Sequence, residues 1–429
     1  MARNMIFFAV LFVVLLVAPD VYIAMEYISP SASGIVKVLW WLPTVLTLTC
    51  FVLANREIMH NTSMRLFFAL VLCVALPKLL FVILQFVFSP VVALVTALVP
   101  VALFAYGFFF GWRRIVVRKA VCESELLPQS FDGYRILQLS DLHIGTFLKN
   151  KSFIRKLVNV VNDQHADLIV FTGDLVNVRA DEVRPFVSDL HIGTFLKNKS
   201  FIRKLVNVVN EQHADLIVFT GDLVNVRADE VRPFVSDLSK MVSKDGVLSV
   251  MGNHDYCEYG QDHSEEYKKR NQNVLHYFER KMGWRLLDNE HVTIGRLRRA
   301  NGENISESIA VIGVENISKP PFPDYGNLAV AMGELPKGMF KVLLSHDPSH
   351  WRRGVLHKTD IALTLSGHTH AGQLKIGKFS PSKWAYNEWG GKYTEGNSML
   401  YVSTGVGGTV PFRFGAWPEI NIITLKRKG

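Results

Sequence analysis

The sequence predicts an α/β domain that follows an all-α region of four membrane-spanning helices. Three observations lead to this prediction. Four long apolar stretches fill the first 112 of the 429 residues. Short apolar runs then alternate with amphipathic helix patterns, and several of these runs end in a polar motif. This alternation of strand and helix is typical of a sheet covered by helices.

The N-terminal region carries four apolar stretches, each long enough to cross about 30 Å of hydrocarbon as a helix. A signal peptide followed by buried core helices is the alternative, because Pro19-Asp20 interrupts the first stretch. Three further stretches with almost no charge favour four membrane spans. Lys78 falls inside the third, and we expect a structural role for it because no acidic residue is expected at similar depth in a neighbouring span. The stretches are residues 5–27, 35–54, 66–88 and 91–112.

Basic residues near the span ends predict the orientation. Seven lie on one side under a four-span topology, whereas Lys37, with Asp20 and Glu26 nearby, lies on the other. Because Lys and Arg are retained in the cytoplasm, we expect a multi-pass membrane protein whose N-terminus and C-terminal domain face the cytoplasm. The seven residues are Arg3, Arg56, Arg65, Arg113, Arg114, Arg118 and Lys119.

Part of the formal net charge of +9 lies just after the last span. The basic segment 113–119 suits anionic lipid headgroups and opens a connector predicted over residues 113–132. We expect a membrane but no nucleic acid as partner, because no recognition motif accompanies the charge. The four cysteines have no metal-ligand spacing and form no disulfide framework, which fits a reducing compartment.

The predicted C-terminal domain, residues 133–429, alternates strands and helices. We expect a helix in each copy of a repeated unit, another over 229–242, a partly helical cover over 255–285 and an exposed hairpin around 296–308. A loop-rich sheet ending in strand 420–425 closes the domain. Strands are predicted at 135–139, 168–171, 246–251, 341–344 and 361–365.

The repeated unit is an internal duplication. Residues 140–187 recur as 188–235 at an offset of 48, and one position differs, Asp163 against Glu211. Solenoid repeats diverge and need three or more units, so two near-identical copies indicate a recent tandem duplication or a sequence-assembly artefact. We expect one copy to occupy the sheet and the other to be extruded. Only Asp141 and His143 follow a strand-like run, so Asp189 and His191 are expected in an inserted loop.

Five polar motifs follow the predicted strands in order. Each alone is weak, since Asp-Leu-His is short and Gly-Asp is usually a turn, but all five at strand ends form a specific pattern. The order resembles the calcineurin-like metallophosphoesterases, and the N-terminal spans resemble their transmembrane type. The resemblance implies an αββα sandwich of mixed sheets. The motifs are Asp141-Leu142-His143, Gly173-Asp174, Gly252-Asn253-His254-Asp255, Ser345-His346 and Gly367-His368-Thr369-His370.

The resemblance also implies two divalent metal ions, manganese or alternatively iron or zinc. Asp141, His143 and His370 would bind one ion, and Asn253, His346 and His368 the other. The Gly-Asp aspartate would bridge them, and the duplication offers Asp174 or Asp222. We favour Asp174, because local pairing forms first. His254 would protonate the leaving oxygen or hold the phosphate, and Asp255 would orient its imidazole.

The predicted function is hydrolysis of a phosphodiester or pyrophosphate by a two-metal-activated water. A site held near the headgroups by a short connector favours a lipid-linked substrate. One alternative is a phosphodiesterase or nuclease that acts on a soluble nucleotide and uses the membrane as a tether. The other is a non-enzymatic protein whose duplicated domain misfolds.

Overall fold

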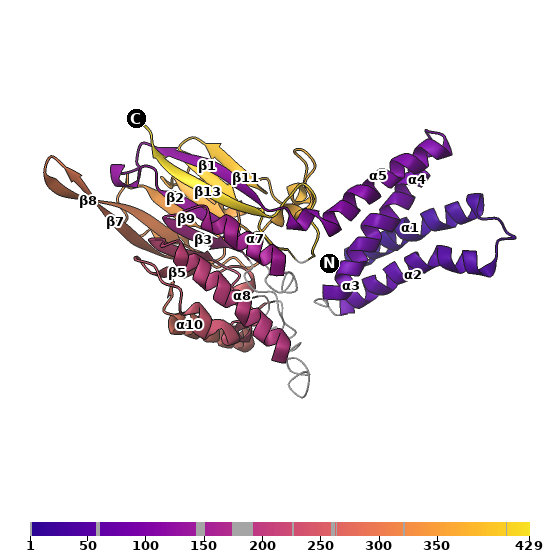
Figure 1. Ribbon diagram of the computed structural model, residues 1–429, viewed down its shortest axis with the longest axis horizontal. Helices are drawn as coiled ribbons and strands as arrows, with labels where there is room; N and C mark the ends of the chain where they lie inside the picture. Colours follow the sequence, from indigo (N-terminus) through magenta and orange to yellow (C-terminus); the bar gives the residue numbers. More distant parts are fainter. Residues whose placement is uncertain are drawn as a thin grey trace. The chain divides into compact units, whose positions relative to one another are not determined.

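The computed structural model describes residues 2–56, 61–142, 151–173, 192–224, 227–258, 262, 264–320, 322–408 and 410–429. The chain divides into two compact units (Figure 1). The helical unit comprises Met1–Trp112 with Val410–Phe414, and the α/β unit comprises Arg113–Thr409 with Gly415–Gly429.

Four helical runs of the first unit are long and apolar enough to cross a membrane, which confirms the prediction. The third run combines α3, a π-helical turn and α4 into one continuous stretch. Proline lies inside every run, and membrane helices tolerate it because neighbouring helices and local π-helical adjustments satisfy the backbone groups that it leaves free. The elements are α1 (Ala2–Tyr27), α2 (Gly34–Arg56), α3 (Asn61–Leu70), η1 (Val71–Ala75), α4 (Leu76–Leu84) and α5 (Pro90–Phe109).

A buried ion pair joins three of these helices. Lys78 Nζ of α4 lies 2.5 Å from Asp20 Oδ1 of α1, and the Thr44 hydroxyl of α2 donates to the other oxygen of Asp20. The Lys78 ammonium also lies 4.4 Å from the ring centroid of Trp40, whose indole N–H donates to the Asp20 carbonyl at 3.2 Å. The expectation that Lys78 has no acidic neighbour was wrong, because α1 does not end at Pro19 and carries Asp20 inside the helix.

Loss of one partner of this pair should destabilise the helical unit. Lys78→Met leaves the Asp20 carboxylate buried and uncompensated, which costs about 3–5 kcal/mol. The double variant Asp20→Asn/Lys78→Met should recover much of that loss, because neither charge remains. The free energy of unfolding in detergent micelles measures both. Lys37→Met, which removes an exposed lysine bound to the Pro30 carbonyl, is the control, and equal losses in all variants would contradict the pairing.

The α/β unit contains two mixed sheets that pack face to face. The seven-stranded sheet has the order β1-β13-β2-β3-β4-β5-β6, and the six-stranded sheet has the order β11-β12-β10-β9-β8-β7. Strands β2 to β6 run parallel to one another, as do β8, β9, β10 and β12. Apolar side chains of both sheets, among them Val170, Val218 and Val342, fill one core between them.

The strands of the first sheet are β1 (Val116–Ser124), β2 (Arg135–Ser140), β3 (Leu168–Thr172), β4 (Leu216–Thr220), β5 (Val247–Val250), β6 (Arg285–Leu286) and β13 (Glu419–Arg427). Those of the second are β7 (Glu290–Ala300), β8 (Glu303–Gly313), β9 (Lys341–Leu344), β10 (Leu363–Ser366), β11 (Gly391–Glu395) and β12 (Ser398–Val402).

Helices cover the outer faces of the two sheets and complete the αββα sandwich. Helices α7 (Lys151–Asn162), α8 (Ile192–Glu211) and α10 (Glu265–Met282) lie along the seven-stranded sheet (Figure 1). Helix α11 (Leu328–Met332) and the turn η8 (Trp351–Val355) pack with a second apolar cluster on the six-stranded sheet. The predicted fold class, a sandwich of mixed sheets behind four apolar helices, is confirmed.

Two segments differ from the expected secondary structure. The predicted connector contains β1, which pairs in parallel with β13 from Val116 to Ser124, because β13 offers it an open edge. The helix expected over 229–242 is replaced by the short turns η5 (Ala228–Glu230) and η6 (Arg232–Phe234) and by α9 (Val235–Leu238). Pro233 explains the break, since it has no backbone N–H and its ring clashes with the preceding turn of a helix.

Both copies of the duplication contribute a strand to the same sheet. The identical runs β3 and β4 pair in parallel and in register, from Leu168 opposite Leu216 to Thr172 opposite Thr220. The prediction that one copy is extruded was therefore wrong. Each copy also contributes its own helix, α7 or α8, so an open sheet gains one strand without exposing its outer face. Asp189 and His191 lie outside the described residues.

Candidate metal centre

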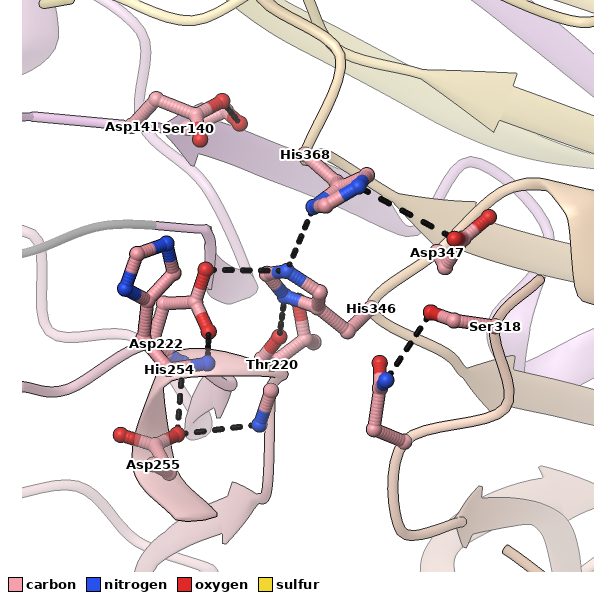
Figure 2. A network of polar contacts seen from close by, with 12 residues as sticks. Ser140, Asp141, Thr220, Asp222, His254, Asp255, Ser318, His346, Asp347 and His368 are labelled. Carbon is pink, nitrogen blue, oxygen red and sulfur yellow. Dashed lines mark hydrogen bonds and ion pairs between the residues drawn. The ribbon is translucent and has the colours of Figure 1, made fainter. Parts of the chain in front are cut away.

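The carboxyl ends of five strands carry the predicted site residues. Asp141 follows β2, Asp222 follows β4 and Asn253 follows β5. His346 and His368 follow β9 and β10 of the other sheet. Because parallel strands bring their carboxyl ends to one edge, these motifs meet there, as Figure 2 shows for Asp141, Asp222, His346 and His368.

Three of these residues form a compact cluster of ligand atoms. One ligand atom from each of Asp222, His346 and His368 lies within 4.8 Å of the other two. His346 Nε2 is 3.0 Å from Asp222 Oδ2 and 3.1 Å from His368 Nδ1. A carboxylate and two imidazoles are a ligand set that suits Mn, Fe or Zn.

Hydrogen bonds on the far sides of the imidazoles orient the cluster. The Nδ1–H of His346 donates to the Thr220 carbonyl at 3.1 Å, so Nε2 is the nitrogen that faces Asp222. His368 Nε2 lies 2.8 Å from the Tyr386 hydroxyl and 3.9 Å from Asp347 Oδ2 (Figure 2), so Nδ1 faces the cluster. Histidine ligands usually bind metals in this arrangement, with the second nitrogen held by an acceptor. The three residues therefore fit one divalent ion.

Electrostatic interactions within the cluster favour a negatively charged Asp222 next to a positively charged His346. Burial raises the pKa of the Asp222 carboxyl, but His346, His254 and His368 together lower it more, so this pKa lies below its usual range. Burial lowers the pKa of His346, whereas the Asp222 carboxylate raises it to about 10. Desolvation instead lowers the pKa of His368 to about 4. Because a metal binds the neutral imidazole, an ion at this site replaces the proton held by His346.

The Gly-Asn-His-Asp segment packs directly against the Asp222 loop. The His254 N–H donates to Asp222 Oδ1 at 2.8 Å. Gly252 permits this approach, because a Cβ at that position would lie 2.3 Å from Asp222 Oδ1. Asn253 is fully buried in the same segment.

Asp255 connects the two loops through backbone hydrogen bonds. Its carboxylate accepts N–H groups from Asp222 at 2.6 Å, Gly252 at 2.9 Å and Val224 at 3.1 Å. Burial and the nearby Asp222 raise the pKa of Asp255 to about 7. These contacts support a positioning role for Asp255, while its predicted role in orienting the His254 imidazole stays a prediction.

Asp141 and His370 form a second pair of predicted ligands. His370 Nε2 lies 3.5 Å from Asp141 Oδ1. The Asp141 N–H donates to the Thr172 carbonyl at 2.7 Å, and the Asp141 carboxylate accepts a hydrogen bond from the Ser140 hydroxyl. The predicted ligands His143 and Asp174 lie outside the described residues, so the preference for Asp174 as the bridge stays a prediction.

Sequence reasoning did not identify three polar residues around the cluster. Asp347 directly follows the predicted ligand His346, and this position next to a ligand could have identified it from the sequence. His350 is buried and its Nδ1 lies 2.9 Å from the Ser345 hydroxyl, while burial lowers its pKa to about 4. Tyr386 reaches His368 from a loop 18 residues further along the chain, and no spacing rule points to it.

Comparisons with known proteins agree with this architecture. The family described as calcineurin-like phosphoesterase matches residues 186–372. A metallophosphoesterase of Helicobacter pylori strain J99 is 30% identical over 326 residues, which cover 75% of this chain and 67% of that protein. The chain belongs to the calcineurin-like metallophosphoesterase family. It is a phosphoric ester hydrolase by family, with a membrane region of four apolar helices.

Two further relatives show different extents of similarity. The metallophosphoesterase YkuE of Bacillus subtilis is 27% identical over 332 residues, covering 75% of this chain and 90% of that protein. A transmembrane protein with a metallophosphoesterase domain from Danio rerio is 29% identical over 315 residues, which cover 71% of this chain and 55% of the Danio rerio protein. The family match begins at residue 186, so it includes Asp222 and leaves out Asp141 and Asp174.

Replacement of Asp222 should weaken metal binding. Asp222→Asn removes the only carboxylate of the cluster, and we expect the Kd for Mn²⁺ to rise by about 100-fold or more. Loss of a residue that only hydrogen-bonds a metal ligand already lowers metal affinity by about 10–100-fold. Isothermal titration calorimetry on the metal-free protein measures this change. Asp229→Asn, at an exposed site paired with Arg232, is the control. An unchanged Kd in Asp222→Asn would rule out Asp222 as a ligand.

Proposed function

We propose that this protein is a membrane-anchored, metal-dependent phosphoesterase that hydrolyses a phosphodiester or pyrophosphate bond of a lipid-linked substrate. The observation that carries this proposal is the cluster of the buried Asp222 and His346 with the half-buried His368 at the carboxyl edge of the strands. Manganese is the proposed metal, with iron or zinc as alternatives that the same ligands accept.

The proposed chemistry assigns separate tasks to metal and protein. Bound divalent ions supply charge neutralisation for the phosphoryl oxygens and an activated water. His254, whose backbone N–H binds Asp222, donates a proton to the leaving oxygen. Asp255 fixes the loop that carries His254 by accepting backbone N–H groups on both sides.

A basic cavity beside the cluster supports a substrate with two phosphates. Its volume is about 90 Å³, and its lining includes Tyr386, whose hydroxyl contacts His368. Arg352 is paired with Glu388 and Glu395, and Arg353 with Asp324, whereas Lys319 forms no ion pair with any described residue. Glu388 itself lines the cavity, and the remaining lining residues are Ser349 and Asn387. A second phosphate of a pyrophosphate would compensate the charge of Lys319.

The membrane region supports a substrate held at the bilayer surface. Arg113, Arg114, Arg118 and Lys119 are exposed directly after the last apolar helix and suit anionic headgroups. We propose that the catalytic unit faces the cytoplasm, as the distribution of Lys and Arg predicts. The proposal is tested with the purified full chain in mixed micelles, comparing a polyprenyl diphosphate sugar with the soluble diester bis(p-nitrophenyl) phosphate. A preference for the soluble diester would contradict the lipid-linked substrate.

Activity should depend on the metal and, separately, on His254. Chelation should abolish hydrolysis and Mn²⁺ should restore it. His254→Ala should lower kcat by about 10²–10⁴-fold, because it removes the proton donor, and should leave the bound Mn²⁺ unchanged. Turnover assays together with elemental analysis measure both effects. His357→Ala, at an exposed histidine paired with Glu395, is the control. Full activity of the metal-free protein would contradict the proposed chemistry.

Lys319 should select substrates with a second phosphate. Lys319→Ala should raise KM for the polyprenyl diphosphate sugar by about 10-fold, the value of a hydrogen bond to a charged group. KM for bis(p-nitrophenyl) phosphate, which has one negative charge, should not change. Lys383→Ala is the matched control, since this exposed lysine does not line the cavity. Equal increases in KM for both substrates would rule out a second-phosphate site.

A further inference from the structure

The duplicated strand changes the spacing of the predicted metal ligands. Asp141 follows β2 and Asp222 follows β4, and β3 lies between these two strands in the sheet. Neighbouring strands lie about 4.8 Å apart, so the ends of β2 and β4 are separated by about 9.6 Å, or two spacings.

A two-metal centre makes a strict demand on that spacing. Its ions lie roughly 3.5–4 Å apart and share a bridging carboxylate. Bonds from metals such as zinc to carboxylate oxygens are about 2.0–2.2 Å long. One aspartate therefore reaches ions on both sides only when the ligand groups it joins are on neighbouring strands.

The two aspartates pack against different strand ends. A Cβ on Gly173, which follows β3, would lie 2.0 Å from Asp141 Oδ1. A Cβ on Gly252, which follows β5, would lie 2.3 Å from Asp222 Oδ1. Asp141 therefore lies against the end of β3, and Asp222 lies against the end of β5.

The imidazoles divide in the same way. His346 and His368 join Asp222 in one group of ligand atoms, and Asp141 is not a member of that group among the described residues. His370 instead lies 3.5 Å from Asp141. The inserted strand thus separates a three-residue cluster from a two-residue pair.

We propose that the duplication uncouples the metal centre: the ion at Asp222, His346 and His368 shares no ligand with Asp141 and His370. Deleting residues 188–235 removes α8 and β4 and leaves one Gly-Asp motif, on a strand adjacent to both β2 and β5. That variant regains the spacing of a bridged pair. The effect of uncoupling on catalysis rests on the proposed metal-dependent function, but the test of the inference measures ion binding and not turnover.

Electron paramagnetic resonance of bound Mn²⁺ separates the two arrangements. The full chain should show the six-line signal of isolated Mn²⁺, and the variant lacking 188–235 should bind two ions and show the multiline signal of an exchange-coupled pair. A coupled signal in the full chain would overturn the proposal. So would isolated ions in a deletion variant whose circular dichroism confirms folding.

Point variants of the full chain decide the question if the deletion variant does not fold. Asp141→Asn should change the Kd of the Mn²⁺ ion at the cluster less than about threefold, whereas Asp222→Asn should raise it by about 100-fold or more. Comparable losses in both variants would indicate a shared centre and overturn the proposal. Failure of the proposed function would appear separately, as Mn²⁺ bound with this pattern but without hydrolysis of either substrate.

Discussion

Parallel, in-register pairing from β2 to β5 is the constraint on which the candidate site depends. Each strand is buried on both faces, and the strands end at the same level. The polar residue that follows each strand therefore lies at the carboxyl edge of the sheet. The second sheet repeats this pattern with β9 and β10, and the core between the sheets holds both edges together. A shift of one residue in any strand would exchange the side chains of its two faces and displace the polar residue that follows it.

Compensation of buried charge is the second recurring requirement. Asp222 is buried and lies 3.0 Å from His346, and its loop is held by the backbone hydrogen bonds of Asp255. In the helical unit the fully buried Asp20 is paired with Lys78 and Thr44. A buried carboxylate without such partners would cost several kcal/mol, so in both units the partners come from other elements.

The duplication shows how an open sheet tolerates an added unit. Each 48-residue copy is a strand with its covering helix, and the copies meet through identical runs in register. The one residue that differs lies at this boundary, where the Asn162 amide donates to Glu211 at 2.9 Å. The stacked rings of Phe171 and Phe219, 4.6 Å apart, continue the ladder. The fold is preserved, while the ligand spacing along the edge changes.

The sequence alone determined the membrane spans, most strands and the family motifs, because these are local patterns of hydrophobicity and short polar runs. It indicated the candidate site through Asn253, His254, His346 and His368, each shortly after an apolar run, but it favoured Asp174 over Asp222 as the bridging aspartate. Only the tertiary structure decided that both copies enter the sheet, that Asp20 reaches Lys78 and that Tyr386 reaches His368. These contacts join residues that are 18 to 58 positions apart in the chain. Tertiary packing decides which residues meet over such separations, and no local sequence pattern encodes it.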